Sequence, residues 1–201
     1  VVWVPFRSTV TGRAIYAIGS AEGAAYMSGL NINRARIAAQ RESILSRTEA
    51  EPVLQRLARV MRKLNPDKTF TLSVHPRGLK LAMEAQDLEE TIGNLVENAS
   101  RFARGEITLN ARAASQDTVG LDPARKTWAV ITIEDDGPGL EPEQIREALK
   151  RGKRLDESKP GTGLGLSIVT EIVSEYQGRF LLSRGDAGGL KAELILPALP
   201  G

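Results

Sequence analysis

Three polar side chains in one predicted helix could bind a phosphorylated ligand. Asn94, Asn98 and Arg101 are spaced by four and then three residues, so a helix places them on one face. A side-chain carbonyl such as that of Asn98 can complete the oxygen shell of Mg²⁺, which takes few protein ligands besides water and phosphate oxygens. Arg101 could hold a phosphate through its charged fork. The alternative is a polar face that only contacts solvent.

A second candidate is a carboxylate where a predicted strand gives way to a glycine-rich turn. Asp135 ends the strand, and Gly137 and Gly139 follow it in the stretch EDDGPGL. Glycines let the backbone come close to a flat ligand, and the carboxylate could accept a hydrogen bond from an exocyclic amine such as that of adenine. Asp-Gly-Pro-Gly is also ordinary turn chemistry, so this stretch alone leaves both readings open.

A third candidate is the run of alternate glycines, Gly161, Gly163 and Gly165, in front of an apolar helix pattern. The first amides of a helix lack partners within it and its dipole favours an anion, so phosphate could bind there. A dinucleotide-binding fold would need a strand before these glycines, and the charged stretch that precedes them is not one. A flexible turn before a buried helix is the other reading.

The charged stretch before these glycines is basic and is predicted to be a loop. Arg151, Lys153, Arg154 and Lys159 could close over the phosphates of a bound ligand. The alternative is a solvated basic loop without a ligand.

The elements that must position these residues follow from periodicity. Helices are predicted over residues 24–47, 51–64, 87–104 and 142–149, and from the third glycine to about residue 176. Strands are predicted over residues 69–74, 79–83, 107–111, 128–134, 179–183 and 190–196, the first two forming a hairpin across the turn 75–78. Asp87 is the predicted N-cap of its helix, with Glu90 in capping-box spacing. Paired strands with helices between them predict an α+β fold, a two-layer sandwich with helices on one face of a sheet.

Composition excludes several other kinds of site. The 201 residues hold 27 basic and 25 acidic side chains, no cysteine and one histidine. A disulfide framework, a thiolate metal site and a histidine-based triad are therefore excluded or improbable. The small positive excess and 4% aromatic content argue against a nucleic-acid binder. No apolar run is long enough to span a bilayer, and no signal peptide is recognisable.

Taken in order, the three stretches resemble a known family. NLVENASRFAR at 94–104, EDDGPGL at 134–140 and GTGLGLSIV at 161–169 are similar to the N, G1 and G2 boxes of the histidine kinase ATP-binding domain. The likeness covers about residues 51–196 and is closest in character to PhoQ-like sensor kinases. It implies a Bergerat-type sandwich, a fold shared with DNA gyrase and a heat-shock chaperone, that holds Mg-ATP.

The resemblance also implies residue roles. Asn98 would bind Mg²⁺, Asn94 and Arg101 would support the triphosphate in catalysis, and Asp135 would accept the adenine amine. The remaining nucleotide contacts would come from the two glycine-rich turns and the basic loop: Gly137, Gly139, Arg151, Arg154, Lys159, Gly161, Thr162, Gly163, Leu164 and Gly165.

One position favours a kinase over an ATPase. The ATP-hydrolysing members of the family resemble one another in having a glutamate base where this chain has Asn94, and an amide cannot take a proton from water at neutral pH. Phosphotransfer to a neutral imidazole needs no such base. The main reading is therefore a histidine kinase domain. A nucleotide-binding signalling module without catalysis and an ATPase are the alternatives.

The phosphoacceptor is expected to lie outside this chain. His75 falls in a predicted turn inside the ATP domain and is followed directly by proline and arginine, unlike an acceptor on a dimerisation helix. Residues 1–50 are predicted to be a separate segment, whose helix resembles the end of the second dimerisation helix, and residues 51–201 the catalytic domain. The resemblance implies histidine-bearing dimerisation helices, a response regulator receiver domain and a homodimer as partners, and a cytoplasmic location below an inner-membrane receptor.

Overall fold

The computed structural model describes residues 47–121, 127–149 and 165–200. The chain separates into two compact units, Val1–Glu42 and Ser43–Gly201, and the first lies outside the described residues. The predicted helix over 24–47, except residue 47, which is not helical, also lies outside them, as do the basic loop and the first two glycines of the G2 stretch. Among the described residues, no helix is both long and apolar enough to cross a bilayer.

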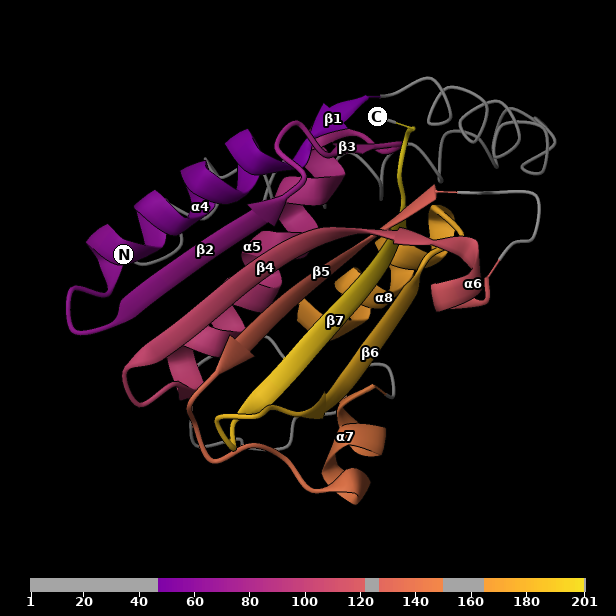
Figure 1. Cartoon of the computed structure of the whole chain (residues 1–201). Coiled ribbons are helices and arrows are strands. Elements are labelled where there is room, and N and C mark those ends of the chain that lie inside the picture. Colours follow the sequence, from indigo (N-terminus) through magenta and orange to yellow (C-terminus); the bar gives the residue numbers. More distant parts are fainter. Residues whose placement is uncertain (1–46, 122–126, 150–164, 201) are drawn as a thin grey trace, which may run out of the picture. The chain divides into compact units, whose positions relative to one another are not determined.

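The second unit is a sheet with helices packed on one face, which confirms the predicted α+β sandwich (Figure 1). Its helices are α4 (Ala50–Leu64), α5 (Ala85–Phe102), α6 (Gln116–Val119), α7 (Pro142–Ala148) and α8 (Gly165–Glu175). Its strands are β1 (Thr48–Glu49), β2 (Thr69–His75), β3 (Lys80–Leu81), β4 (Glu106–Ser115), β5 (Thr127–Asp135), β6 (Arg179–Arg184) and β7 (Leu190–Pro197). The main sheet has the order β2-β4-β5-β7-β6, and β1 pairs with β3.

The sheet corrects the predicted hairpin at residues 69–83. β2 pairs with β4 in parallel, with Phe70 beside Ile107, and α5 supplies the crossover between them. The second predicted strand is only β3, which pairs with β1 instead. A parallel pair needs a connection longer than a tight turn, and the turn residues after β2 mimic a hairpin signal without making one.

The core lies between the sheet and α4, α5 and α8. β5 shows how the sequence produces it, because its alternate residues face opposite sides of the sheet. Ala129, Ile131 and Ile133 are buried in the main core under the helices, whereas Trp128 and Val130 belong to a smaller cluster on the other face. β5 is therefore packed on both faces near its start, and this packing fixes the strand whose last residue is Asp135.

The start of α5 differs from the prediction. The helix begins at Ala85 with Glu84 as its N-cap, so Asp87 is in the first turn rather than at the cap. Its carboxylate instead accepts a hydrogen bond from the hydroxyl of Tyr176, just after α8, and that hydroxyl accepts one from the Glu84 backbone N–H at 3.2 Å. This long-range partner, invisible to local sequence, explains why the capping-box pattern is not used.

Candidate nucleotide-binding site

The polar face of α5 has the arrangement that the spacing predicted, and its three side chains differ in what they contact. Asn94 donates from Nδ2 to the Glu90 carbonyl oxygen at 2.8 Å, and Arg101 pairs with Glu97 at 2.9 Å on the helix surface. The half-buried Asn98 amide has no hydrogen-bond partner among the described residues. Its oxygen is therefore available to a ligand or metal.

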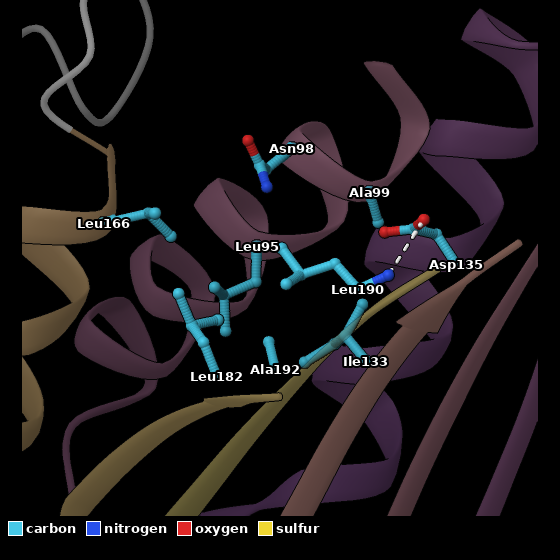
Figure 2. Close-up of a pocket in the computed structure, with 9 residues that line it drawn as sticks. All are labelled: Leu95, Asn98, Ala99, Ile133, Asp135, Leu166, Leu182, Leu190 and Ala192. Carbon is cyan, nitrogen blue, oxygen red and sulfur yellow. Dashed lines mark hydrogen bonds between the residues drawn. The ribbon is translucent and has the colours of Figure 1, made fainter. Parts of the chain in front are cut away.

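Asn98 lies at the rim of a small pocket in which several elements meet (Figure 2). The pocket is mostly apolar and small, with a cavity volume of about 10 Å³, roughly the space that one water molecule needs. Its lining residues come from α5, β5, α8, β6 and β7: Leu95, Asn98, Ala99, Ile133, Asp135, Leu166, Leu182, Leu190 and Ala192.

Asp135 is the buried polar group of this pocket, with only 3% of the residue exposed. Its Oδ1 atom accepts two backbone hydrogen bonds, from Gly137 N at 2.8 Å and from Leu190 N at 3.3 Å. Burial raises the pKa of Asp135, and these two N–H donors only partly offset that effect. Because Oδ1 is engaged, Oδ2 is the oxygen left to accept a hydrogen bond from a ligand.

Glycines surround Asp135 because side chains would not fit there. A Cβ atom on Gly137 would lie 2.5 Å from the Phe102 carbonyl oxygen, and one on Gly189 would lie 2.5 Å from Asp135 Oδ1. Gly139 has a φ of +70°, and its Cβ would lie 2.7 Å from the Gly188 carbonyl oxygen. The G1 turn and the β6–β7 connection therefore pack backbone to backbone against the carboxylate.

Asp136 has a positioning role that sequence reasoning missed. Its Oδ1 accepts hydrogen bonds from the backbone N–H groups of Arg104 at 2.7 Å and Gly105 at 3.0 Å. Burial alone would raise the pKa of Asp136, but backbone donors led by Gly105 lower it below its usual value. This carboxylate ties the end of α5 to the G1 turn. The only local sign of this role in the sequence is a second aspartate directly after Asp135.

The apolar lining was only partly foreseen. Leu166 was expected to pack the core from α8, and it also lines the pocket; the β-strand residues Leu182, Leu190 and Ala192 were not assigned to the site. Their contribution depends on the strand order, which brings β7 beside β5. No local motif reports that pairing.

Of the nucleotide-contacting residues predicted in the G2 stretch, the structure describes only Gly165. It begins α8, and a Cβ placed on it would lie 3.1 Å from Asn94 Oδ1, so α8 starts directly against the N-box face of α5. Arg151, Arg154, Lys159, Gly161, Thr162, Gly163 and Leu164 lie outside the described residues.

Within the described ranges, no group of three or more histidine, cysteine or acidic side chains could hold a metal ion by itself.

Comparison with known proteins agrees with this geometry. Residues 83–200 match the family model described as histidine kinase-, DNA gyrase B- and HSP90-like ATPase. The chain is 38% identical over 122 residues to the sensor protein kinase CarS of Pseudomonas aeruginosa, covering 61% of this chain and 25% of that protein. It is 31% identical over 144 residues to the two-component sensor PhoQ of the same organism, covering 71% of this chain and 30% of that protein. The chain thus spans under a third of these relatives.

Solved structures show the same fold. The mycobacterial sensor histidine kinase MprB superposes with a TM-score of 0.64 at 23% identity, over 78% of this chain and 100% of that one. The histidine kinase domain of the E. coli osmosensor EnvZ superposes with a TM-score of 0.55 at 26% identity, over 78% of this chain and 90% of that one. The pocket, the three boxes and these matches together place the chain in the histidine kinase-, DNA gyrase B- and HSP90-like ATPase family, as an ATP-binding catalytic domain of the sensor histidine kinase type.

Proposed function

We propose that this chain binds Mg-ATP in the pocket described above and donates the γ-phosphate to a histidine on a dimerisation helix, for relay to an aspartate of a response regulator receiver domain. The observation that supports it most is that two polar side chains with hydrogen-bonding capacity left for a ligand line the same pocket. Asp135 offers Oδ2 from the buried end, and Asn98 offers an amide without a partner among the described residues at the rim.

Adenine recognition follows from the Asp135 environment. The ionised Oδ2 can accept a hydrogen bond from the exocyclic amine of adenine, whereas the carbonyl oxygen of guanine at the equivalent place would meet a like-charged acceptor. Leu95, Ile133 and Ala192 provide the apolar surface on which a flat base can lie. Specificity therefore rests on one carboxylate held by backbone donors.

The triphosphate end is assigned to the polar face of α5. Asn98 would hold Mg²⁺ through its side-chain oxygen, and the metal would neutralise charge on the phosphates. Arg101, whose ion pair among the described residues is with the exposed Glu97, could turn to a phosphate oxygen at little cost. Residues of the basic loop, Arg151, Arg154 and Lys159, complete the proposed set, with Thr162, Leu164 and the G2 glycines around the nucleotide.

Asn94 favours transfer over hydrolysis. Its Nδ2 is committed to the Glu90 carbonyl oxygen, and an amide offers no base to deprotonate water. A neutral imidazole nitrogen can attack the γ-phosphorus directly. The N–P bond forms as the bond to the ADP oxygen breaks, and the imidazole then loses its proton. Asn94 would support this step through its place on the polar face of α5.

The acceptor would come from another helix, because His75 is remote from the pocket. The sheet register aligns Thr69 with Glu106 and Ile107 with Asp135, so the pocket lies near the start of β2. His75 is the last residue of β2, roughly 20 Å along the strand at about 3.3 Å per residue. We therefore propose a homodimer whose dimerisation helices carry the histidine, on the cytoplasmic side of a membrane receptor.

The first test titrates ATP into this chain with and without Mg²⁺. Asn98→Ala should weaken Mg-ATP binding about tenfold or more and remove most of its dependence on Mg²⁺, because the protein ligand to the metal is lost. Asn110→Ala is the matched control, since Asn110 is an exposed amide on β4. Unchanged affinity and metal dependence in the Asn98 variant would refute the site assignment.

A second measurement separates the kinase from its alternatives. This chain should phosphorylate histidine-bearing dimerisation helices supplied in trans, and should not label itself at His75. Nucleotide binding without transfer would favour a non-catalytic signalling module. Steady phosphate release without an acceptor would favour an ATPase.

A further inference from the structure

Helix α8 lies on α5 with its two ends fixed at separate points. Its first residue, Gly165, is next to Asn94, and Tyr176, which follows its last residue, contacts Asp87 in the first turn of α5. Since Asp87 precedes Asn94 while Tyr176 follows Gly165, the two helices run antiparallel. The end near Gly165 borders the nucleotide pocket, and the end near Tyr176 is distant from it.

At the distant end, the Tyr176 hydroxyl adds a polar contact to the packing of Val173 and the Tyr176 ring in the main core. Tyr176 is only 7% exposed, and its hydroxyl donates to Asp87 Oδ2 while accepting from the Glu84 backbone N–H at 3.2 Å. Burial, followed by the hydrogen bond to Asp87, raises the pKa of Tyr176, so the hydroxyl stays protonated and remains a donor. Both partners belong to the beginning of α5, so the contact joins the end of α8 to the start of α5.

The near end leaves little room for movement. A Cβ on Gly165 would lie 3.1 Å from Asn94 Oδ1, and the next residue, Leu166, lines the pocket together with Asn98 (Figure 2). A helix of 11 residues at about 1.5 Å per residue is a short rod, so a shift at one end displaces the other. A slide of α8 along α5 would therefore move Leu166 in the wall of the pocket.

We propose that Tyr176 is a positioning residue for nucleotide binding, whose hydroxyl fixes the register of α8 on α5 and thereby places Leu166 opposite Asn98. The proposal rests on the nucleotide-binding function proposed above. Tyr176 does not line the pocket, so its effect is exerted through α8.

The test compares ATP affinity in variants that change only this contact. Tyr176→Phe keeps the ring and removes the hydroxyl, and should weaken ATP binding about threefold to tenfold, the effect of losing one hydrogen bond of modest net strength. Asp87→Ala should do the same. Asp87→Asn, which keeps an oxygen acceptor, should retain most of the affinity.

Ser100→Ala is the matched control for the loss of a buried hydroxyl. Ser100 is buried in α5 and its hydroxyl donates to the Val96 carbonyl oxygen at 2.7 Å, within one helix rather than between two. This variant should leave ATP affinity within twofold of wild type. In amide NMR spectra without nucleotide, Tyr176→Phe should shift the Gly165 and Leu166 signals, and Ser100→Ala should not.

The outcomes are distinguishable. If wild type binds ATP, and Tyr176→Phe binds equally well or Ser100→Ala is impaired to the same degree, the positioning role is wrong while the proposed function stands. Unshifted Gly165 and Leu166 signals in Tyr176→Phe would also overturn it. If wild type itself binds no ATP, the proposed function fails, and the NMR comparison still decides whether Tyr176 sets the register of α8.

Discussion

Asp135 combines two properties that usually conflict in one residue. It is almost fully buried, which penalises its charge, yet the proposed role needs that charge to accept a hydrogen bond. Gly137 and Leu190 resolve part of the conflict by donating two backbone hydrogen bonds to one oxygen and leaving the other for the ligand. The residue therefore costs stability in return for recognition.

Asp135→Asn should show that trade directly. The amide oxygen can keep the two backbone donors while its NH₂ group faces the pocket, so ATP should bind about tenfold to a hundredfold more weakly. Calorimetric titration measures this loss, with inosine triphosphate as a comparison ligand that offers an acceptor instead of an amine. Equal affinity of the variant and wild type for ATP would contradict the adenine assignment.

The same variant carries a stability prediction with a definite sign. Folding raises the pKa of Asp135, so the folded state binds its proton more tightly and stability falls as pH rises through the raised value. An uncharged side chain removes that penalty, so Asp135→Asn should unfold at the same or a higher temperature than wild type at neutral pH. The difference should shrink in acid, where Asp135 is protonated. A clear drop in the midpoint at neutral pH would contradict this sign.

Among the secondary-structure elements, two glycines in different settings should respond oppositely to alanine. Gly93 is inside α5 with nothing within 4 Å of an added Cβ, so Gly93→Ala should stabilise the protein by up to about 1 kcal/mol through helix propensity. A Cβ on Gly189 would enter the space of Asp135, so Gly189→Ala should destabilise by about 1–3 kcal/mol through overpacking. Urea unfolding measures both changes. A Gly189→Ala variant as stable as wild type would show that the close packing around Asp135 is not rigid, and a destabilised Gly93→Ala variant would contradict the propensity argument.

Local patterns predicted the helices and strands better than their partners. The stripe of α4 and the alternation of β5 arise from burial of one face, which a sequence displays directly. The parallel pairing of β2 with β4 and the contact between Tyr176 and Asp87 depend on residues far apart in the chain. For the same reason Asn98 and Asp135 were foreseen from their motifs, whereas Leu182 and Ala192 were not.

At the level of the whole chain, residues Ser43–Gly201 form a compact unit of their own. The described buried residues of its main cluster lie between Ala50 and Ala198. A chain of residues 43–201 should therefore keep its thermal midpoint within a few degrees and bind ATP with unchanged affinity. Thermal melting and the same titration check this. A truncated chain that is unfolded, or that binds ATP much more weakly, would mean that the first unit stabilises the second.

The placement of β7 between β5 and β6 has a consequence for synthesis. Leu190 and Ala192 belong to β7, which follows every other described strand in the sequence, yet they line the same pocket as Leu95 and Asn98. While the chain is being made, its N-terminal regions emerge from the ribosome first, and the pocket stays open on one side until β7 has followed. Cellular nucleotide can then stabilise only the finished domain, by mass action on the folded state.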